Sequence, residues 1–144
     1  MKDDRLRVPL EDAYAAALGN AAYVFATLEW NAVWCCERMK AGYINTLGKK
    51  TAGKIGTNLV ELSEKRERDT GSAACVAPAR KFYDLVEVRN ALLHAKPGTA
   101  PGGAQRLFRN GEVWSIEKIN DAADAFAACS IELNALLYGE LAAP

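Results

Sequence analysis

Two long stretches without proline constrain the fold of this chain most strongly. No proline occurs between Pro9 and Pro78 or between Pro101 and Pro144, and 26 of the 144 residues are alanine. Because proline breaks helix interiors and alanine has the highest helix propensity, these stretches predict long helices. The length suits one hydrophobic core, so we expect residues 1–144 to form a single domain.

Apolar residues recur at steps of three and four in four segments, which is the spacing of a helix face that packs on a core. We therefore predict an all-α fold, an up-down bundle of four main helices over residues 10–39, 51–68, 78–95 and 116–141. Gly71 marks the exit of the second helix, and Ser115 is the expected N-cap of the last. Asn110-Gly111 lies between two short apolar runs, so a small β-hairpin or an extended loop should precede the last helix.

The charged residues balance, with 18 Lys and Arg against 18 Asp and Glu. This argues against a protein that coats nucleic acid by bulk attraction, although a local basic groove stays open. No apolar run reaches membrane-spanning length, and the N-terminal segment lacks the apolar region of a signal peptide. We therefore expect a cytoplasmic protein without membrane contact.

Histidine and cysteine usage argues against a metal site and against a cofactor. His94 is the only histidine, so one chain cannot supply two imidazole ligands. The four cysteines lack paired CxxC spacing, and two of them are adjacent on different faces of a helix. We expect them to be small core residues in a reducing compartment: Cys35, Cys36, Cys75 and Cys129.

The third predicted helix places an arginine in its apolar stripe. Arg89 falls on one line with Phe82, Val86 and Leu93. Because an unpaired buried guanidinium is costly, Arg89 must meet a carboxylate, reach the mouth of a cleft, or project into a subunit interface. The first alternative is an internal ion pair with Glu29, Glu61 or another acid.

A polar stripe runs beside this apolar one. Tyr83, Glu87, Asn90 and His94 follow each other at steps of four, three and four, so Asn90 and His94 can touch. The simple interpretation of this stripe is a solvated helix face with a surface histidine. The alternative is a functional site to which these side chains contribute together.

The segment from Arg89 to His94, Arg-Asn-Ala-Leu-Leu-His, resembles the RNxxxH motif of the HEPN superfamily. Its position late in the third long helix and the length of the chain agree with that resemblance. The resemblance implies a metal-independent endoribonuclease of toxin or host-defence type, with two motif copies meeting across a homodimer. By analogy Arg89 binds the scissile phosphate, His94 is the general acid and base, and Asn90 orients the histidine or the phosphate.

One histidine per chain cannot act as acid and base at once, so two chains would supply two. The residue two positions after His94 is Lys96, where one branch of toxins has a tyrosine, and this argues against the nucleotidyltransferase antitoxin of that branch. Lys96 either contacts phosphate or simply favours the negative end of the helix dipole. Tyr83 and Glu87 are further candidates to support the site.

Three large aromatic residues in the first predicted helix lie roughly opposite its core stripe: Tyr23, Trp30 and Trp34. They indicate a helix packed between two neighbours in its own bundle or one lying against a second subunit. A base-stacking platform is a third interpretation.

Lys49, Lys50 and Lys54 form a basic cluster near the start of the second helix, which either solvates the helix end or follows an RNA backbone. The sequence thus carries two functional hypotheses. The first is the dimeric endoribonuclease, controlled by an antitoxin or another regulatory protein. The second is a non-catalytic HEPN-like module that binds a nucleotide, RNA or a protein.

Overall fold

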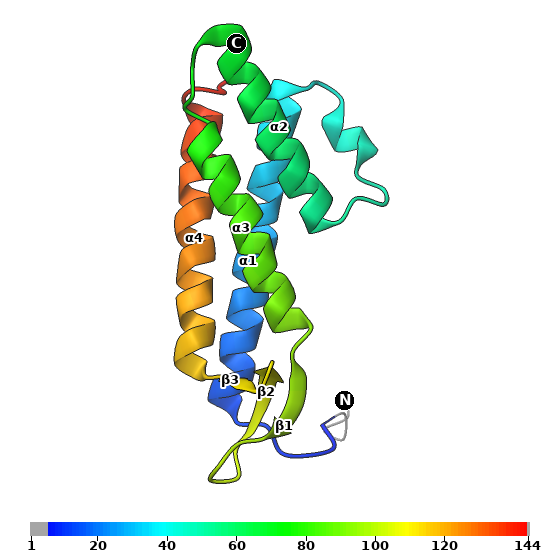
Figure 1. The fold of residues 1–144 in the computed structure, drawn as a ribbon, viewed down its shortest axis with the longest axis vertical. Coiled ribbons are helices and arrows are strands. Elements are labelled where there is room, and N and C mark those ends of the chain that lie inside the picture. The colour runs from blue at the N-terminus through cyan, green and yellow to red at the C-terminus, as the bar shows by residue number, and fades with distance from the viewer. Residues whose placement is uncertain (1–5, 144) are drawn as a thin grey trace.

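The structure is a computed structural model, and it describes residues 6–143. Four helices and a small antiparallel sheet make up the fold (Figure 1). In chain order the elements are α1 (Asp12–Met39), the 3-10 helix η1 (Tyr43–Thr46), α2 (Ala52–Thr70), α3 (Val76–Leu93), β1 (Lys96–Thr99), β2 (Gln105–Arg109), β3 (Glu112–Trp114) and α4 (Ile116–Tyr138). The mostly helical fold with four main helices is therefore confirmed. Residues 1–5, which carry part of the expectation about the N-terminal segment, lie outside the described range.

Local signals in the sequence account for the helix boundaries. The Ser115 hydroxyl accepts a hydrogen bond from the Lys118 N–H (3.0 Å), which confirms the expected N-cap of α4. Gly71 ends α2 at a φ of 79°, where a residue without a side chain is favoured. α3 begins two residues before Pro78, because a first helical turn tolerates proline.

The predicted hairpin is confirmed as β2 and β3, and it gains a third strand. Asn110 (φ 52°) and Gly111 (φ 80°) form the tight turn. β1 pairs antiparallel with β2, and Pro97 is tolerated because β1 is an edge strand. The Tyr14 hydroxyl of α1 donates to the Trp114 carbonyl (2.7 Å) and accepts from the Leu107 N–H (3.0 Å), so it ties the sheet to the helices.

The helices surround one core. α1 lies against α4 and α2, and α3 lies against α2 and α4. Phe25, Phe82 and Phe126 meet at the centre, with ring centroids 6.2 Å apart for Phe25–Phe82 and 5.1 Å for Phe25–Phe126. Removing any of these rings should cost about 3–5 kcal/mol, the range for a buried aromatic.

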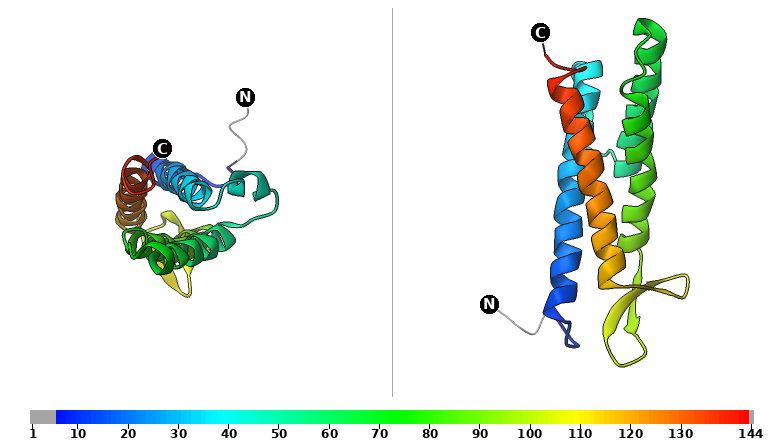
Figure 2. Two further views of the ribbon diagram at one scale, coloured as in Figure 1. Left: turned by 90° about the horizontal axis from the view of Figure 1, so that it is seen from above. Right: turned by 90° about the vertical axis from the view of Figure 1, so that its left-hand side faces the viewer.

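The helix directions do not simply alternate. Figures 1 and 2 show α1, α2 and α4 running toward the end opposite the sheet, and α3 running back. α1 and α2 share a direction because residues 40–51 carry the chain back along the bundle. The Glu37 carboxylate holds that connection by accepting hydrogen bonds from the N–H groups of Gly42 (2.8 Å) and Ile44 (3.0 Å). The expected up-down arrangement is thus not confirmed.

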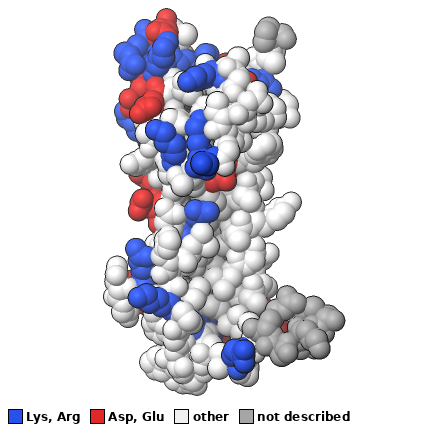
Figure 3. Space-filling model, turned by 90° about the vertical axis from the view of Figure 1, so that its right-hand side faces the viewer, with Lys and Arg blue, Asp and Glu red and all other residues white. Residues whose placement is uncertain are grey.

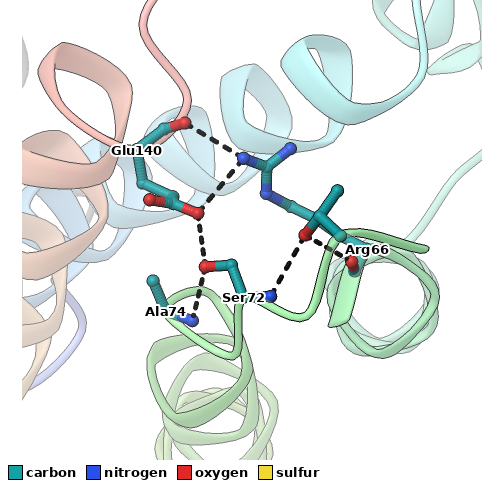
Figure 4. Close-up of polar contacts among 5 residues, drawn as sticks. Arg66, Ser72, Ala74 and Glu140 are labelled. Atoms are coloured by element: carbon teal, nitrogen blue, oxygen red, sulfur yellow. Dashed lines mark hydrogen bonds and ion pairs between the residues drawn. The ribbon is translucent and has the colours of Figure 1, made fainter. Parts of the chain in front are cut away.

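A polar cluster joins α2 to the C-terminal end of α4 (Figure 4). Arg66 Nη2 donates to the Glu140 carbonyl and to Glu140 Oε1, both at 3.2 Å, and the Ser72 hydroxyl donates to the same carboxylate. The hydrogen bonds from Ser72 and Arg66 lower the pKa of Glu140.

All four cysteines are free and buried, which confirms them as small core residues. Burial raises the pKa of Cys35 and of Cys36 to about 12. Within residues 6–143, no three His, Cys, Asp or Glu side chains gather as metal ligands would. Over the same range, no helix has the length and apolar character needed to cross a membrane.

Candidate functional site

Arg89 is half-buried on α3 and is held by two neighbours. Its guanidinium carbon lies 5.2 Å from the ring centroid of Phe25, close enough for a cation–π contact. Its Nη1 donates a hydrogen bond to Asn90 Oδ1 (3.0 Å). Asn90, the next residue in the chain, therefore orients the guanidinium.

The internal ion pair, one of the three alternatives for Arg89, is not formed in the described residues. Among residues 6–143, no carboxylate lies within 4.0 Å of its side chain. Glu29 of α1 is the acid whose titration Arg89 affects: burial raises the pKa of Glu29, and the positive charge of Arg89 partly opposes that rise. Glu61 instead lines a separate depression beside α2. The guanidinium thus keeps donors for a ligand.

Arg89 lines a pocket of about 510 Å³ between α1 and α3. Arg89 and Glu29 are its charged residues, and its other walls are mostly apolar: Leu18, Gly19, Ala21, Ala22, Phe25, Ala26, Leu92, Leu93, Ala95, Leu107 and Phe126. Such a site suits a ligand with an apolar or aromatic part and an anionic group.

The position of α2 explains why the pocket between α1 and α3 stays open. Gly56, the fifth residue of α2, faces Tyr83 of α3, where an added Cβ would lie 3.5 Å from the Tyr83 Cα. Only four residues of α2 precede Gly56, whereas ten residues of α3 follow Tyr83, so the last part of α3 extends past the start of α2. Figure 1 shows α2 beside only the upper part of the bundle.

His94 does not line the pocket. It is exposed at the C-cap of α3, and its backbone N–H donates to the Asn90 carbonyl (2.9 Å). The Asn90 side chain hydrogen-bonds Arg89, and no side-chain bond joins Asn90 to His94 in the described residues. Arg89 and Asn90 are thus brought together, and His94 lies at the solvent-facing end of the same helix.

The three supporting candidates are exposed. Tyr83 and Glu87 lie on the outer face of α3, and Lys96 is the first residue of β1. None forms a side-chain hydrogen bond with Arg89 or His94 in the part of the chain that is described. Tyr83 borders a different depression, together with Arg80 and Asp84.

The α1 wall of the pocket does not follow from the sequence patterns above. In them Glu29 is only one of several candidate ion-pair partners for Arg89. One signal was available, because Glu29 is the single charged residue between Ala13 and Cys36. A single carboxylate in such an apolar helix is a reason to look for a polar site beside it.

The exposed aromatic residues of α1 lie beside this pocket. Tyr23 is 76% exposed and Trp30 is 50% exposed, so no neighbouring helix of the same chain covers them. Trp34 is half-buried, and its ring centroid lies 6.0 Å from that of Trp30 in an edge-to-face contact. Gly19 and Ala26, which line the pocket, are four residues from Tyr23 and Trp30, and so lie one helical turn from them.

Comparison of the chain with protein-family models, with curated proteins and with solved structures finds no significant match.

Proposed function

We propose that this chain is a HEPN-like, metal-independent endoribonuclease that acts as a homodimer. One observation carries the proposal: Arg89 is half-buried at a pocket, oriented by Asn90, and has no described carboxylate within ion-pair distance. Proteins rarely bury an arginine without a carboxylate, so this side chain is suited to an anionic ligand that arrives from solution.

The proposed chemistry follows from the two charged side chains. Arg89 binds the scissile phosphate and stabilises the negative charge that grows on it, at a pocket with mostly apolar walls. One His94 accepts the proton of the ribose 2′-hydroxyl as its oxygen attacks phosphorus. The other His94 protonates the departing 5′-oxygen, which leaves a 2′,3′-cyclic phosphate and a 5′-hydroxyl. No metal ion takes part.

The dimer in this proposal forms along α1. Between Ala13 and Cys36 that helix carries one charged residue, Glu29, although one of its faces is exposed. Helices that are apolar on all sides are normally covered, and exposed Tyr and Trp are typical interface anchors. Because Tyr23 and Trp30 adjoin the pocket, a second copy packed on them brings two Arg89–His94 pairs toward each other.

The proposal also includes supporting residues, a cellular compartment and a regulatory partner. Lys96, exposed two residues beyond His94, adds a phosphate contact, and Tyr83 and Glu87 are further support residues on the exposed face of the helix that carries Arg89. The four free thiols support a reducing cytoplasm as the working compartment. An antitoxin or another regulatory protein controls the activity, as in the toxin and host-defence proteins that the motif resembles.

Cleavage of RNA by purified protein in the presence of EDTA tests the proposal. We expect the wild type to release fragments with cyclic phosphate ends, and Arg89→Ala or His94→Ala to lower the rate by at least about 100-fold. The control is Arg80→Ala, which removes an exposed arginine paired with Glu64 on the surface. Equal rates for the wild type and both site variants would reject the endoribonuclease.

A second candidate function, a non-catalytic binding module, is favoured by the exclusion of His94 from the pocket that Arg89 lines. In that case a nucleotide places its base against the apolar wall and its phosphate on Arg89. Calorimetric titration with AMP should then show binding that Arg89→Ala abolishes and His94→Ala retains, with RNA left intact. Loss of AMP binding in both variants, or in neither, would argue against this role.

A further inference from the structure

A second candidate site lies away from Arg89, in a groove beside α2. Its volume is about 400 Å³, and we call it the basic groove. Five cationic side chains and one carboxylate line it: Lys40, Lys50, Lys54, Lys65, Arg68 and Glu61. Because the whole chain has no net charge, this groove concentrates positive charge locally. Figure 3 shows Lys and Arg side chains gathered over the upper half of the face that α2 borders.

Tertiary structure brings these cations together from three segments. Lys54, Lys65 and Arg68 share one face of α2, where they follow each other at steps of eleven and three. Lys40 comes from the C-cap of α1, and Lys50 from the connection that returns the chain to the start of α2. The row along α2 is about 21 Å long, from fourteen residues at about 1.5 Å each.

Polar contacts hold the floor of the basic groove in place. The Tyr43 hydroxyl donates to Asn58 Oδ1 (2.9 Å), so this bond uses the amide oxygen of Asn58, a residue of the groove lining, and not its N–H donors. Lys50 Nζ lies 3.9 Å from the Tyr43 ring centroid and donates to the Thr46 hydroxyl (2.6 Å). One cation and one amide are therefore positioned before any ligand binds.

The donor-rich lining defines the ligand chemistry. Lysine, arginine and amide N–H groups need acceptors, and among residues 6–143 Glu61 is the only carboxylate lining the groove. Lys65 also pairs with Asp69 at the edge, and this contact lowers the pKa of Asp69. A single anion would meet only two or three of these cations. A strand with a phosphate at every residue can meet them all, and phosphate contacts of this kind dominate nucleic-acid affinity.

We propose that the basic groove binds the phosphodiester backbone of a single-stranded nucleic acid without reading its sequence. The choice of RNA as that strand rests on the proposed function. A concave, linear site fits a strand better than a lipid surface, because Leu62 is the one aliphatic residue in the described lining and is only half-exposed. The groove holds the RNA, and the Arg89 pocket acts on it.

Binding of a fluorescent oligouridine of about 20 nucleotides, followed by anisotropy over a range of salt concentrations, tests the proposal. The groove variant combines Lys54→Gln, Lys65→Gln and Arg68→Gln, all exposed on α2. It should bind at least about tenfold more weakly, and the slope of log affinity against log salt should fall by about 2, near 0.7 for each lost phosphate contact. The matched control removes the same charge elsewhere, with Lys81→Gln, Arg109→Gln and Lys118→Gln.

Four results would overturn the basic groove as a strand site. These are unchanged binding by the groove variant, an equal loss in the control variant, preferential binding of wild type to anionic lipid vesicles, and preferential binding to a polyglutamate peptide. The last two results would assign the groove to a different partner.

Failure of the proposed function gives a different pattern. If the wild type binds RNA through the groove but never cleaves it, the endoribonuclease fails and the groove stands. If the wild type cleaves RNA and the groove variant keeps the same KM, the groove fails and the endoribonuclease stands.

Discussion

At the scale of single residues, Arg89 shows how one polar side chain is kept in an apolar stripe. The residue is half-buried, and its charged end contacts the Phe25 ring and donates to the Asn90 side chain. The nearby carboxylate of Glu29 adds a favourable charge without closing the guanidinium in an ion pair. This arrangement leaves the cation available at the pocket wall.

Glu29 gives the first prediction at this scale. Burial raises its pKa above 4.5, so the folded state holds the proton more tightly than the unfolded state does. The ionised form therefore opposes folding, and this loss of stability grows as the pH rises from about 4.5 through the folded-state pKa. Glu29→Gln should be more stable than wild type near pH 7, by about 0.5 kcal/mol after allowance for solvent screening.

Urea unfolding at about pH 4 and about pH 7 measures this effect. The gain should be present at the higher pH and nearly absent at the lower. Glu87→Gln, an equal change of charge on an exposed side chain, serves as the control. A Glu29→Gln variant less stable than wild type at neutral pH would show that the charge of Glu29 on Arg89 outweighs its burial.

The sequence predicts the position of Arg89 but not its neighbours. Helical periodicity is enough to place it on the core side of α3, because side-chain directions repeat along any helix. Whether it meets a carboxylate depends on which residues of α1 lie opposite. Helix packing determines which residues these are. From the sequence alone, a carboxylate such as Glu29, a cleft and a subunit interface are therefore equal alternatives for the surroundings of Arg89.

At the scale of elements, the segments that connect the helices and strands determine how these elements are arranged. Helix propensity and capping predict where α2 and α4 begin, because these effects act within a few residues. The direction of α2 depends on residues 40–51, which Glu37 holds through two backbone N–H groups. The third strand likewise needs residues 96–99 to meet β2 across a loop.

The polar cluster of Arg66, Ser72 and Glu140 provides a prediction about how α2 is joined to the C-terminal end of α4. Hydrogen bonds from Ser72 and Arg66 lower the pKa of Glu140 below 4.5. A depressed carboxylate pKa stabilises the fold above about pH 4.5, and that stabilisation is lost as the pH falls through the folded-state pKa. Glu140→Gln should lower Tm at neutral pH, because the variant loses the charged partner of Arg66.

Thermal unfolding followed by circular dichroism across the acid range checks this expectation. Below the folded-state pKa of Glu140 the variant and the wild type should converge. Glu132→Gln, an exposed change on α4, should unfold like wild type at each pH. A constant difference between Glu140→Gln and wild type at all pH values would mean that the carboxylate charge is not the cause.

At the scale of the whole molecule, an exposed apolar surface borders a polar pocket. Tyr23 and Trp30 lie one helical turn from Gly19 and Ala26, which line the pocket of Arg89. The basic groove lies further along, beside the C-terminal end of α1 and α2. The proposed dimer face, catalytic pocket and strand site therefore follow one another on a single elongated molecule.

The oligomeric state gives the prediction at this scale. Wild type should be a dimer by size-exclusion chromatography with light scattering, because a second copy covers Tyr23 and Trp30. The double variant Tyr23→Glu and Trp30→Glu should be a folded monomer, since two buried carboxylates would face each other across the interface. It should also lose RNA cleavage while retaining its helical circular dichroism spectrum.

Val113→Glu, a charge placed at an exposed apolar position of β3, is the control and should remain a dimer. A wild-type protein that stays monomeric at high concentration would contradict the composite site. Cleavage by that monomer would further require an acid or base other than a second His94.

The sequence by itself determined the helices, the N-cap at Ser115, the hairpin turn and the side of α3 on which Arg89 lies. These properties depend on residues within a few positions of one another, so local sterics and periodicity are sufficient. Only the tertiary structure decided that Arg89 meets Phe25, that α2 leaves the seam between α1 and α3 open, and that Lys40 joins cations of α2. Each of these depends on segments far apart in the chain, whose meeting is set by the packing of one core.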